Sequence, residues 1–453
     1  MNMQWGKRPT WRNYQTRLKR KSDLKNILCR IRWAAVAICA MMLISPGIKA
    51  YFRPDTLNST QTEEAAQSLP IPVSFEPGIG KREIRGWLSP ESVSNLEKKS
   101  FDIRVDQQHF RVDTSLDLPL QALLLKKVRS SDAELMGLVV LDPDDGRVLA
   151  MVGVNQDHSS SNPCFDNRFP AASIFKIVTA AAAIEQSHFT PQTILTFNGG
   201  KYTLYKSQLK NTVNRYTNTI SFRDSFAQSV NPVFGKIGAQ VGKASLESYG
   251  RAFGFNQEID FEVALPSSTL EVNGEAYHLA EIGCGFNRIT TLTPIHGALI
   301  AAAVLNGGRL PEPTMIEQIV DENGREIYQS SPSLAGEAMS SGTSTLLEKM
   351  MTQTVRTGTC QKIFANAAKD RVLSKLEIGG KSGSIDNLEH TRRMDWFVGF
   401  AREKNGTEKI AVAVVVGHGR YIGTKAAEFA RYTIRSYFKE YSAATERENI
   451  RAG

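Results

Sequence analysis

Residues 169 to 178 read Phe169-Pro170-Ala171-Ala172-Ser173-Ile174-Phe175-Lys176-Ile177-Val178, and an alanine-rich segment continues from there to Ile184. Proline disfavours helical backbone in the residue before it and suits the first turn of a helix, so a helix is predicted to begin at or just before Ser173. The side chains that follow are apolar on nearly every face, which is typical of a helix buried all round. This helix nevertheless carries a lysine, Lys176.

Ser173 and Lys176 are three residues apart, so both side chains are predicted to project from one face of the first turn. Desolvation lowers the pKa of a lysine, and a serine beside a neutral amine can become a nucleophile. The same Ser-x-x-Lys pattern recurs among polar or charged neighbours at Ser22/Lys25, Ser207/Lys210 and Ser436/Lys439. The apolar setting distinguishes the Ser173 copy, because lysines are rarely buried without a reason.

The amino-terminal tail is strongly basic. Residues 1–32 hold ten lysines and arginines but one acidic residue, Asp23, and the resulting net charge of +9 equals that of the whole chain. The rest of the chain is therefore neutral overall, which argues against nucleic acid as a partner of the main body.

An apolar segment, residues 33–48, follows the tail and contains no charge between Arg32 and Lys49. It is slightly short for a membrane span, but an interfacial Trp33 and snorkelling of the two flanking cations can extend it. We expect a single-pass signal-anchor at 33–50 in the cytoplasmic (inner) membrane, with residues 1–32 in the cytoplasm and the rest on the extracytoplasmic side. A cleaved signal peptide, which Ile48 fits poorly, and a buried core helix are the alternatives.

The rest of the chain predicts one sheet assembled from distant strands. Residues 51–109 are rich in Pro, Ser, Thr, Glu and Gly, so we expect a stalk or small juxtamembrane segment there, with packing that begins near Phe101. Apolar runs and alternation predict strands at 110–114, 137–142, 147–152, 396–401 and 410–416. Helices are expected at 118–128 and 425–441, and residues 190–350 look mainly helical and loop-like. A domain over 110–441 and a tail at 442–453 follow from this pattern.

Other chemistries find little support in the sequence. The seven histidines are scattered and form no metal-binding cluster, so neither a metal nor another cofactor is expected. Gly380-Lys381-Ser382 is not the end of a phosphate-binding loop, because Lys375 occupies the position of that loop's first glycine. Cys164, Cys284 and Cys360 are too few for a disulfide framework, and a bridge or a free thiol at Cys164 both remain open.

Two further patterns lie downstream. Ser229-Val230-Asn231-Pro232 falls where one helix is expected to end and another to begin, so Ser229 and Asn231 can both point into a cleft; a helix cap is the alternative. Residues 378–385 form a glycine-rich strand that carries Lys381, Ser382 and Ser384. Its glycines are expected to let a ligand approach the backbone, and its lysine to bring a fixed positive charge to a strand edge suited to a carboxylate. A glycine-rich turn is the alternative there.

Together the patterns resemble the motifs of the penicillin-binding protein and serine β-lactamase superfamily, which are Ser-x-x-Lys, Ser-x-Asn and Lys-Thr/Ser-Gly in this order. The corresponding residues are Ser173/Lys176, Ser229/Asn231 and Lys381-Ser382-Gly383. The resemblance covers about residues 110 to 440, including 142–151, 281–285 and 396–400. It implies an α/β fold of the α+β type, with a central antiparallel sheet flanked by helices and an inserted all-helical lobe.

The resemblance also implies a mechanism. Ser173 attacks a peptide carbonyl to give an acyl-enzyme, with Lys176 as the base. Ser229 relays a proton to the leaving amine, and Asn231 holds the substrate's amide. Lys381-Ser382-Gly383 and Ser384 bind the terminal carboxylate, while the backbone N–H groups of Ser173 and Ser384 form the oxyanion hole.

The anchor and the extracytoplasmic body suit a monofunctional peptidoglycan D,D-transpeptidase that cross-links stem peptides and is acylated by β-lactams. Proteins of a cell-wall synthesis complex are expected as further partners. A D,D-carboxypeptidase, which uses water as the acceptor, and a non-catalytic β-lactam-binding sensor or scaffold are the alternatives. A β-lactamase is disfavoured because no Glu-x-x-Leu-Asn sequence lies between Ser229 and Lys381.

Overall fold

The computed structural model describes residues 79–156 and 162–452. The predicted basic tail and signal-anchor, residues 1–50, lie outside this range and stay predictions. Across the described ranges, no helix combines the length and the apolar character that a membrane crossing requires.

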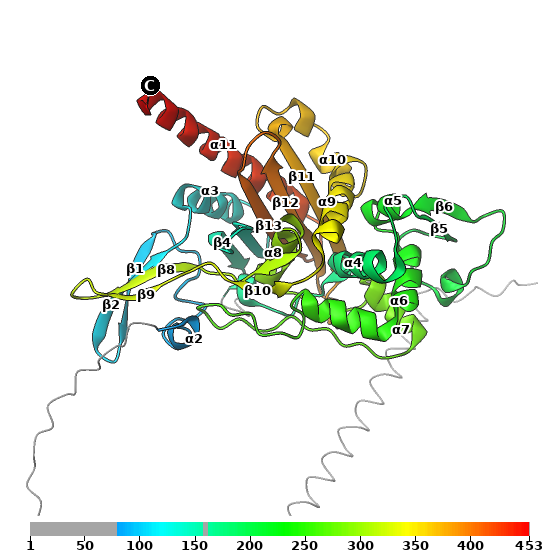
Figure 1. Ribbon diagram of the computed structural model, residues 1–453, viewed down its shortest axis with the longest axis horizontal. Helices are drawn as coiled ribbons and strands as arrows, with labels where there is room; N and C mark the ends of the chain where they lie inside the picture. Colours follow the sequence, from blue (N-terminus) through cyan, green and yellow to red (C-terminus); the bar gives the residue numbers. More distant parts are fainter. Residues whose placement is uncertain (1–78, 157–161, 453) are drawn as a thin grey trace, which may run out of the picture. The chain divides into compact units, whose positions relative to one another are not determined.

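A five-stranded antiparallel sheet forms the centre, in the order β11-β12-β13-β3-β4 (Figure 1). Its strands are β3 (Leu135–Leu141), β4 (Val148–Asn155), β11 (Leu376–Asp386), β12 (Arg393–Glu403) and β13 (Lys409–His418). The pairing of β13 with β3 joins the last strands of the chain to the first. Both of these strands are apolar runs buried along nearly their whole length, which is why their positions were predictable. The predicted antiparallel sheet built from distant pieces is confirmed.

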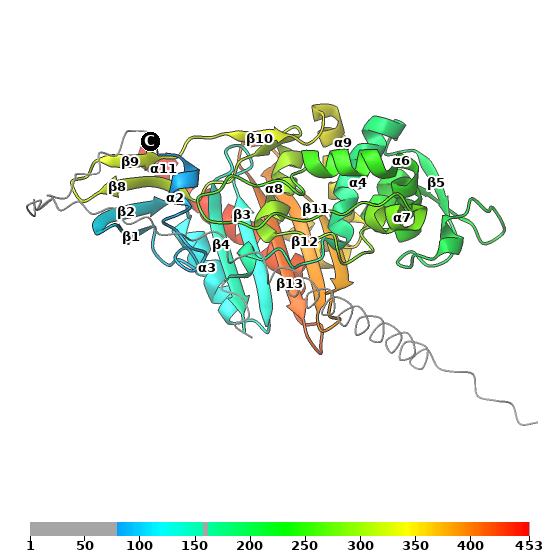
Figure 2. The ribbon, with the colours of Figure 1, turned by 90° about the horizontal axis from the view of Figure 1, so that it is seen from below.

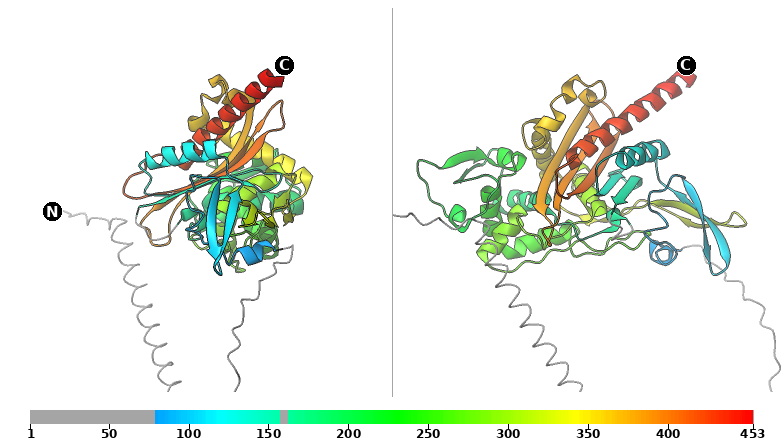
Figure 3. Two further views of the ribbon diagram at one scale, coloured as in Figure 1. Left: turned by 90° about the vertical axis from the view of Figure 1, so that its left-hand side faces the viewer. Right: turned by 180° about the vertical axis from the view of Figure 1, so that it is seen from behind.

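Helices cover both faces of this sheet (Figure 3). The face toward the nucleophile packs on α4 (Lys176–Ser187), α8 (Pro294–Leu305) and most of α9 (Ser341–Arg356). The other face packs on α3 (Leu118–Arg129), α10 (Gln361–Phe364) and α11 (Ala426–Ala452). The sheet therefore separates two apolar cores. The helix predicted at 425–441 is longer than expected, because α11 continues through the predicted tail to Ala452.

The lobe inserted between β4 and β11 contains α5 (Phe222–Ala227), α6 (Asn231–Ala252) and α7 (Ala276–Cys284). It is not all helical, which corrects the expectation. The chain between α4 and α5 forms a strand pair, β5 (Ile194–Phe197) with β6 (Asn218–Ser221), visible at one end of the molecule in Figures 1 and 2. The β-branched and aromatic residues of β5 (Ile194, Thr196 and Phe197) are the sequence signal for this pair.

A second sheet lies at the opposite end of the described body (Figures 1 and 2). Its order is β1-β2-β8-β9, from β1 (Ser100–Val105), β2 (Gln108–Thr114), β8 (Ile316–Asp321) and β9 (Glu326–Gln329). The domain boundary predicted at residue 110 therefore falls inside β2. The remaining short elements are β7 (Arg309–Pro311), β10 (Leu334–Glu337), η2 (Pro163–Phe165), η3 (Ala172–Phe175), η4 (Lys206–Leu209), η5 (Ala367–Lys369) and η6 (Leu373–Lys375).

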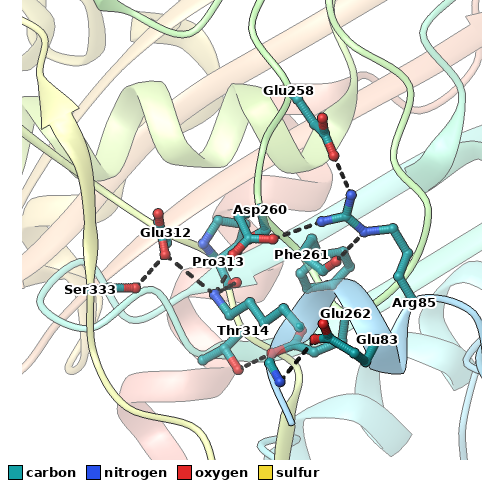
Figure 4. Close-up of polar contacts among 12 residues, drawn as sticks. Glu83, Arg85, Glu258, Asp260, Phe261, Glu262, Glu312, Pro313, Thr314 and Ser333 are labelled. Atoms are coloured by element: carbon teal, nitrogen blue, oxygen red, sulfur yellow. Dashed lines mark hydrogen bonds and ion pairs between the residues drawn. The ribbon is translucent and has the colours of Figure 1, made fainter. Parts of the chain in front are cut away.

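Packing begins well before the expected Phe101. The segment from α2 (Lys81–Ile84) to residue 97, which we call the clasp, buries Ile84, Leu88 and Val93. Polar contacts hold its first turn to the loops around residues 258–262 and 312–315 (Figure 4). Lys81 Nζ donates to the carbonyl of Pro313 at 2.9 Å, so the clasp is part of the folded body.

Arg85 and Glu262 make further contacts in the clasp region. Arg85 donates to the carbonyl of Phe261 at 3.0 Å and pairs with Asp260 at 2.7 Å and with Glu258. Glu262 is fully buried and accepts hydrogen bonds from Thr314, from the N–H of Met315 and from Tyr328. Burial raises the pKa of Glu262, and the positive charge of Lys81 opposes this rise.

Candidate active site

The predicted nucleophile lies on a tight turn. Ser173 belongs to the 3-10 turn η3, and α4 begins at Lys176, directly after η3. Helical backbone therefore begins where the sequence predicted. Ala172, the residue before the serine, has a φ of +48°, a conformation that costs energy for a residue with a Cβ. Gly285 crosses behind this turn so closely that a Cβ on it would lie 1.8 Å from the Ala172 carbonyl oxygen. The residue after α7 therefore packs directly against this turn.

Lys176 is fully buried and makes three polar contacts. Its Nζ donates to Ser173 Oγ at 2.7 Å, to Asn231 Oδ1 at 2.8 Å and to the Cys284 carbonyl at 2.6 Å. Burial lowers the pKa of Lys176 to about 8. Three acceptors satisfy an ammonium group. A neutral amine retains two N–H groups and one lone pair, so it can keep Asn231 and Cys284 while its lone pair faces Ser173.

Ser229 and Asn231 lie at the corner between α5 and α6, as predicted. Ser229 has a φ of +55°, and both side chains are nearly buried. The helix-cap alternative does not hold, because the residue that caps α6 is Val230. Asn231 Nδ2 donates to the Tyr202 carbonyl at 3.1 Å, which orients the amide so that its oxygen faces Lys176. The asparagine therefore links the corner to the nucleophile turn.

Lys381 projects from β11 into the protein. It is fully buried, and its Nζ donates to Ser229 Oγ at 3.0 Å and to the Ser382 carbonyl at 2.9 Å. Burial, and then the charge of Lys176, hold the pKa of Lys381 well below its usual value. The side chain of Lys381 is therefore buried and not exposed at the strand edge, and the predicted part of Lys381 in binding a carboxylate stays a prediction. The lysine instead faces the hydroxyl of Ser229.

The glycines of β11 are also used differently from the prediction. A Cβ on Gly379 or Gly380 would lie 2.4 Å from the ring of Phe400 or Phe397, respectively. Aromatic side chains of β12 therefore fill the space that was expected to admit a ligand. Gly383 differs, because a Cβ there would lie 3.1 Å from the backbone nitrogen of Ser173. This glycine brings β11 against the nucleophile turn.

The two serines of β11 are two residues apart and so lie on the same side of the strand. Ser382 Oγ lies 2.5 Å from the hydroxyl of Thr359, and Ser384 Oγ accepts a hydrogen bond from Arg393 Nε at 2.9 Å. Ser384 is exposed and Ser382 is partly exposed. Each hydroxyl therefore has a protein partner and an accessible side from which a ligand can approach.

The fold therefore brings the predicted site residues together from three separate segments of the chain. Sequence reasoning missed four contributors: the carbonyls of Tyr202 and Cys284, and the side chains of Thr359 and Arg393. Every residue has a backbone carbonyl, so the residue type at a position does not indicate that its carbonyl contacts the site. Arg393 is the first residue of β12, a strand that the apolar run at 396–401 predicted. Its place at the start of the strand that follows the Lys-Ser-Gly motif was the sequence signal that could have indicated a site residue.

Comparison with known families identifies the chain. The family model described as "Penicillin binding protein transpeptidase domain" matches residues 136–435. The chain belongs to this transpeptidase family. The resemblance stated from the motifs is thereby confirmed.

Named relatives of this transpeptidase domain are distant. The chain is 25% identical over 385 residues to "Peptidoglycan D,D-transpeptidase PbpA" of Mycolicibacterium smegmatis, covering 74% of each chain. It is 22% identical to "Stage V sporulation protein D" of Bacillus subtilis, of which it spans 54%. The crystal structure of PBPA from Mycobacterium tuberculosis superposes with a TM-score of 0.59 at 22% identity, covering 72% of this chain and 81% of that one. At such identity the structural match supports the fold alone.

The cysteines of the transpeptidase domain are free thiols. Cys164, Cys284 and Cys360 are all buried and unbridged, so the free-thiol alternative applies to Cys164. Burial raises the pKa of the Cys284 thiol to about 11 and that of Cys164 to about 12, which keeps both protonated near neutral pH. Cys284 meets Lys176 through its carbonyl. In the described part of the chain, no group of three or more histidine, cysteine or acidic side chains is placed to hold a metal ion.

Proposed function

We propose that this protein is a peptidoglycan D,D-transpeptidase that cross-links stem peptides through an acyl-enzyme on Ser173 and is acylated there by β-lactams. The observation that carries this proposal is the fully buried Lys176, whose Nζ lies 2.7 Å from Ser173 Oγ. Membership of the transpeptidase domain family and the D,D-transpeptidase among its named relatives support it. A related M. tuberculosis structure is described as an imipenem acyl-enzyme complex.

Acylation begins with the neutral form of Lys176. Its lone pair takes the proton of Ser173 as Oγ bonds to the carbonyl carbon of the penultimate D-alanine. The pKa of about 8 makes this amine neutral in roughly a tenth of molecules at pH 7 and in about half at pH 8. Ser173 itself remains a poor nucleophile without this base, so the depressed pKa is the chemical basis of the step.

Collapse of the tetrahedral intermediate breaks the carbon–nitrogen bond, and the leaving amine of the terminal D-alanine must gain a proton. Ser229 Oγ lies next to Lys381 Nζ and is suited to deliver one. The proton that Lys176 took from Ser173 replaces the one that Ser229 gives up, and the hydrogen bond from Lys381 Nζ orients Ser229 Oγ for this relay. The buried position of Lys381, unexpected from the sequence, fits this role better than the binding of a carboxylate.

The substrate contacts come from the remaining motif residues. We assign the side-chain amide of Asn231 to the substrate's amide and the hydroxyls of Ser382 and Ser384 to its terminal carboxylate. The N–H groups of Ser173 and Ser384 are assigned to the oxyanion that forms in the transition state. The close approach of Gly383 to the nucleophile turn, where a Cβ would lie 3.1 Å from the Ser173 nitrogen, supports this assignment.

A membrane location completes the proposal. The basic tail at 1–32 and the apolar segment at 33–50 support a single-pass anchor, with the catalytic domain on the extracytoplasmic side where peptidoglycan is found. Partners in a cell-wall synthesis complex are expected on the same grounds. Fractionation of cells that express the full chain tests the anchor: resistance to alkaline carbonate but release by detergent is the expected result.

Labelling with a fluorescent penicillin tests the nucleophile. The wild-type protein is expected to be labelled covalently, and Ser173→Ala and Lys176→Ala are each expected to abolish labelling. Ser207→Ala is the matched control, because Ser207 and Lys210 repeat the Ser-x-x-Lys pattern on the surface and labelling should persist. Labelled Ser173→Ala protein would overturn the site.

Product analysis separates the transpeptidase from its alternatives. A pentapeptide donor with a D-amino acid acceptor should give an exchanged peptide as well as free D-alanine. Hydrolysed peptide alone at high acceptor concentration would instead establish a D,D-carboxypeptidase. Labelling without any turnover would establish a β-lactam-binding sensor or scaffold.

A further inference from the structure

Thr359 lies at the corner between α9 and α10 and contacts two motif segments at once. Its backbone N–H donates to the carbonyl of Ala227, 3.1 Å away, at the end of α5 and two residues before Ser229. Its hydroxyl lies 2.5 Å from Ser382 Oγ on β11. Gly358 makes this approach possible, since a Cβ there would lie 2.2 Å from the Ala227 carbonyl oxygen. The backbone of Thr359 is therefore fixed relative to the Ser229 corner.

The main chain of Ser382 is tied to the same corner by a second route. Lys381 Nζ donates both to Ser229 Oγ, at 3.0 Å, and to the Ser382 carbonyl, at 2.9 Å. Lys381 thus holds the backbone of Ser382, and Thr359 holds its side-chain oxygen. A serine hydroxyl can otherwise rotate among staggered positions, so the threonine contact selects the direction in which the O–H points.

The number of protons on the two hydroxyls decides which of them can donate in this contact when a carboxylate is bound. A hydroxyl has one proton to donate, and a carboxylate accepts hydrogen bonds only. If Ser382 donated to Thr359, it would face a substrate carboxylate with lone pairs, which is repulsive. If Thr359 donates to Ser382, the Ser382 proton is free for the carboxylate. A bound carboxylate therefore favours the arrangement in which Thr359 is the donor.

We propose that Thr359 is a positioning residue for the substrate carboxylate, whose hydroxyl donates to Ser382 Oγ and so directs the Ser382 O–H toward the carboxylate of a donor peptide or a β-lactam. This inference rests on the proposed function, in which Ser382 binds that carboxylate. Thr359 fixes the orientation of a binding group that occupies an edge strand. It also explains why a partly exposed serine there can act as a directed donor.

The test compares a penicillin that carries its free carboxylate with the methyl ester of the same compound. Thr359→Val keeps the shape of the side chain and removes the hydroxyl. We expect this variant to lower the acylation rate constant for the acid by about three- to tenfold, the range for one hydrogen bond between neutral groups, and that for the ester by less than about twofold. Thr359→Ser restores the hydroxyl and should return both rates to within about twofold of wild type.

Two further variants make the test specific. In a Ser382→Ala background, Thr359→Val should have no further effect on the acid, because its only route to the carboxylate is gone. Thr357→Val, in the same corner but hydrogen-bonded to Gln353, should leave both rates unchanged. Equal slowing of acid and ester by Thr359→Val, or no slowing of the acid, would overturn the inference. Failure of the proposed function would give a different result, because the wild-type protein would then not be labelled at Ser173.

Discussion

At the scale of single residues, the site depends on two buried lysines with different environments. Lys176 has three acceptors around it, and burial lowers its pKa to about 8. Lys381 is also buried, and burial together with the charge of Lys176 holds its pKa well below the usual value. Because two like charges disfavour each other at close range, one of the two amines loses its proton more easily than an isolated lysine would. In the proposed mechanism, this repulsion favours a neutral amine that can act as a base at physiological pH.

The pH dependence of acylation follows from Lys176. The reactive form is the neutral amine, so the rate constant should rise about tenfold per pH unit below the pKa and level off above about pH 8. The measurement is the second-order rate of labelling by a fluorescent penicillin from pH 6 to 9.5, with circular dichroism at each pH as the control for folding. A rate that is constant across this range would contradict a titrating lysine as the base.

At the scale of elements, local patterns predicted the parts of the site, and non-local pairing decided how they are used. The helix after Ser173 and the strands β3, β12 and β13 are apolar runs that are visible in the sequence. The use of the β11 glycines was not predictable, because it depends on which β12 residue lies opposite each of them. The register pairs Gly380 with Gly399, and the ring of Phe397 covers the free space beside it. Likewise, the burial of Lys381 depends on its contacts with Phe226 of α5 and with Ser229, which the sequence around Lys381 alone does not predict.

Two glycine variants separate packing from catalysis on β11. In Gly380→Ala the new Cβ meets the buried ring of Phe397 at 2.4 Å, so we expect a loss of about 1 to 3 kcal/mol in the free energy of unfolding. In Gly383→Ala the Cβ meets Ala172 and the Ser173 nitrogen at 3.1 Å, so the nucleophile turn shifts slightly. This variant should acylate at least about tenfold more slowly while it loses less stability than Gly380→Ala. Urea denaturation and penicillin labelling of both proteins provide the measurements, and the reverse order of effects would contradict the assignment.

At the scale of the whole molecule, the sequence did not indicate that packing begins before Phe101. Residues 51–109 were expected to be a stalk or small segment, because their composition is polar and rich in proline and glycine. A short segment can still be folded if it has few apolar residues that reach an existing core. Ile84, Leu88 and Val93 do so, and Trp87 stacks on Phe110 with ring centroids 5.2 Å apart. The folding of the clasp thus depends on tertiary packing, which cannot be predicted from amino-acid composition.

The clasp is expected to contribute stability without taking part in the chemistry. Ile84→Ala removes a fully buried side chain and should cost about 2 to 4 kcal/mol. Arg85→Ala removes contacts to Asp260 and Glu258, which are half exposed or more, and should cost about 1 kcal/mol or less. Arg111→Ala is the matched control, since that exposed arginine pairs with Asp113 on the surface and should change stability by less than about 0.5 kcal/mol.

These three proteins are compared by thermal melting and by the rate of penicillin labelling at a temperature where each is folded. The clasp variants should melt earlier in the order Ile84→Ala, then Arg85→Ala, yet they should be labelled at the wild-type rate, because none of the clasp contacts includes Ser173, Lys176 or Ser229. A wild-type melting curve for Ile84→Ala would mean that residues 79–97 are an appendage, as the stalk interpretation held. Slower labelling by the folded Arg85→Ala protein would instead mean that the clasp influences the nucleophile through the loop at 253–262, where Phe255 packs on Phe175 with ring centroids 5.3 Å apart.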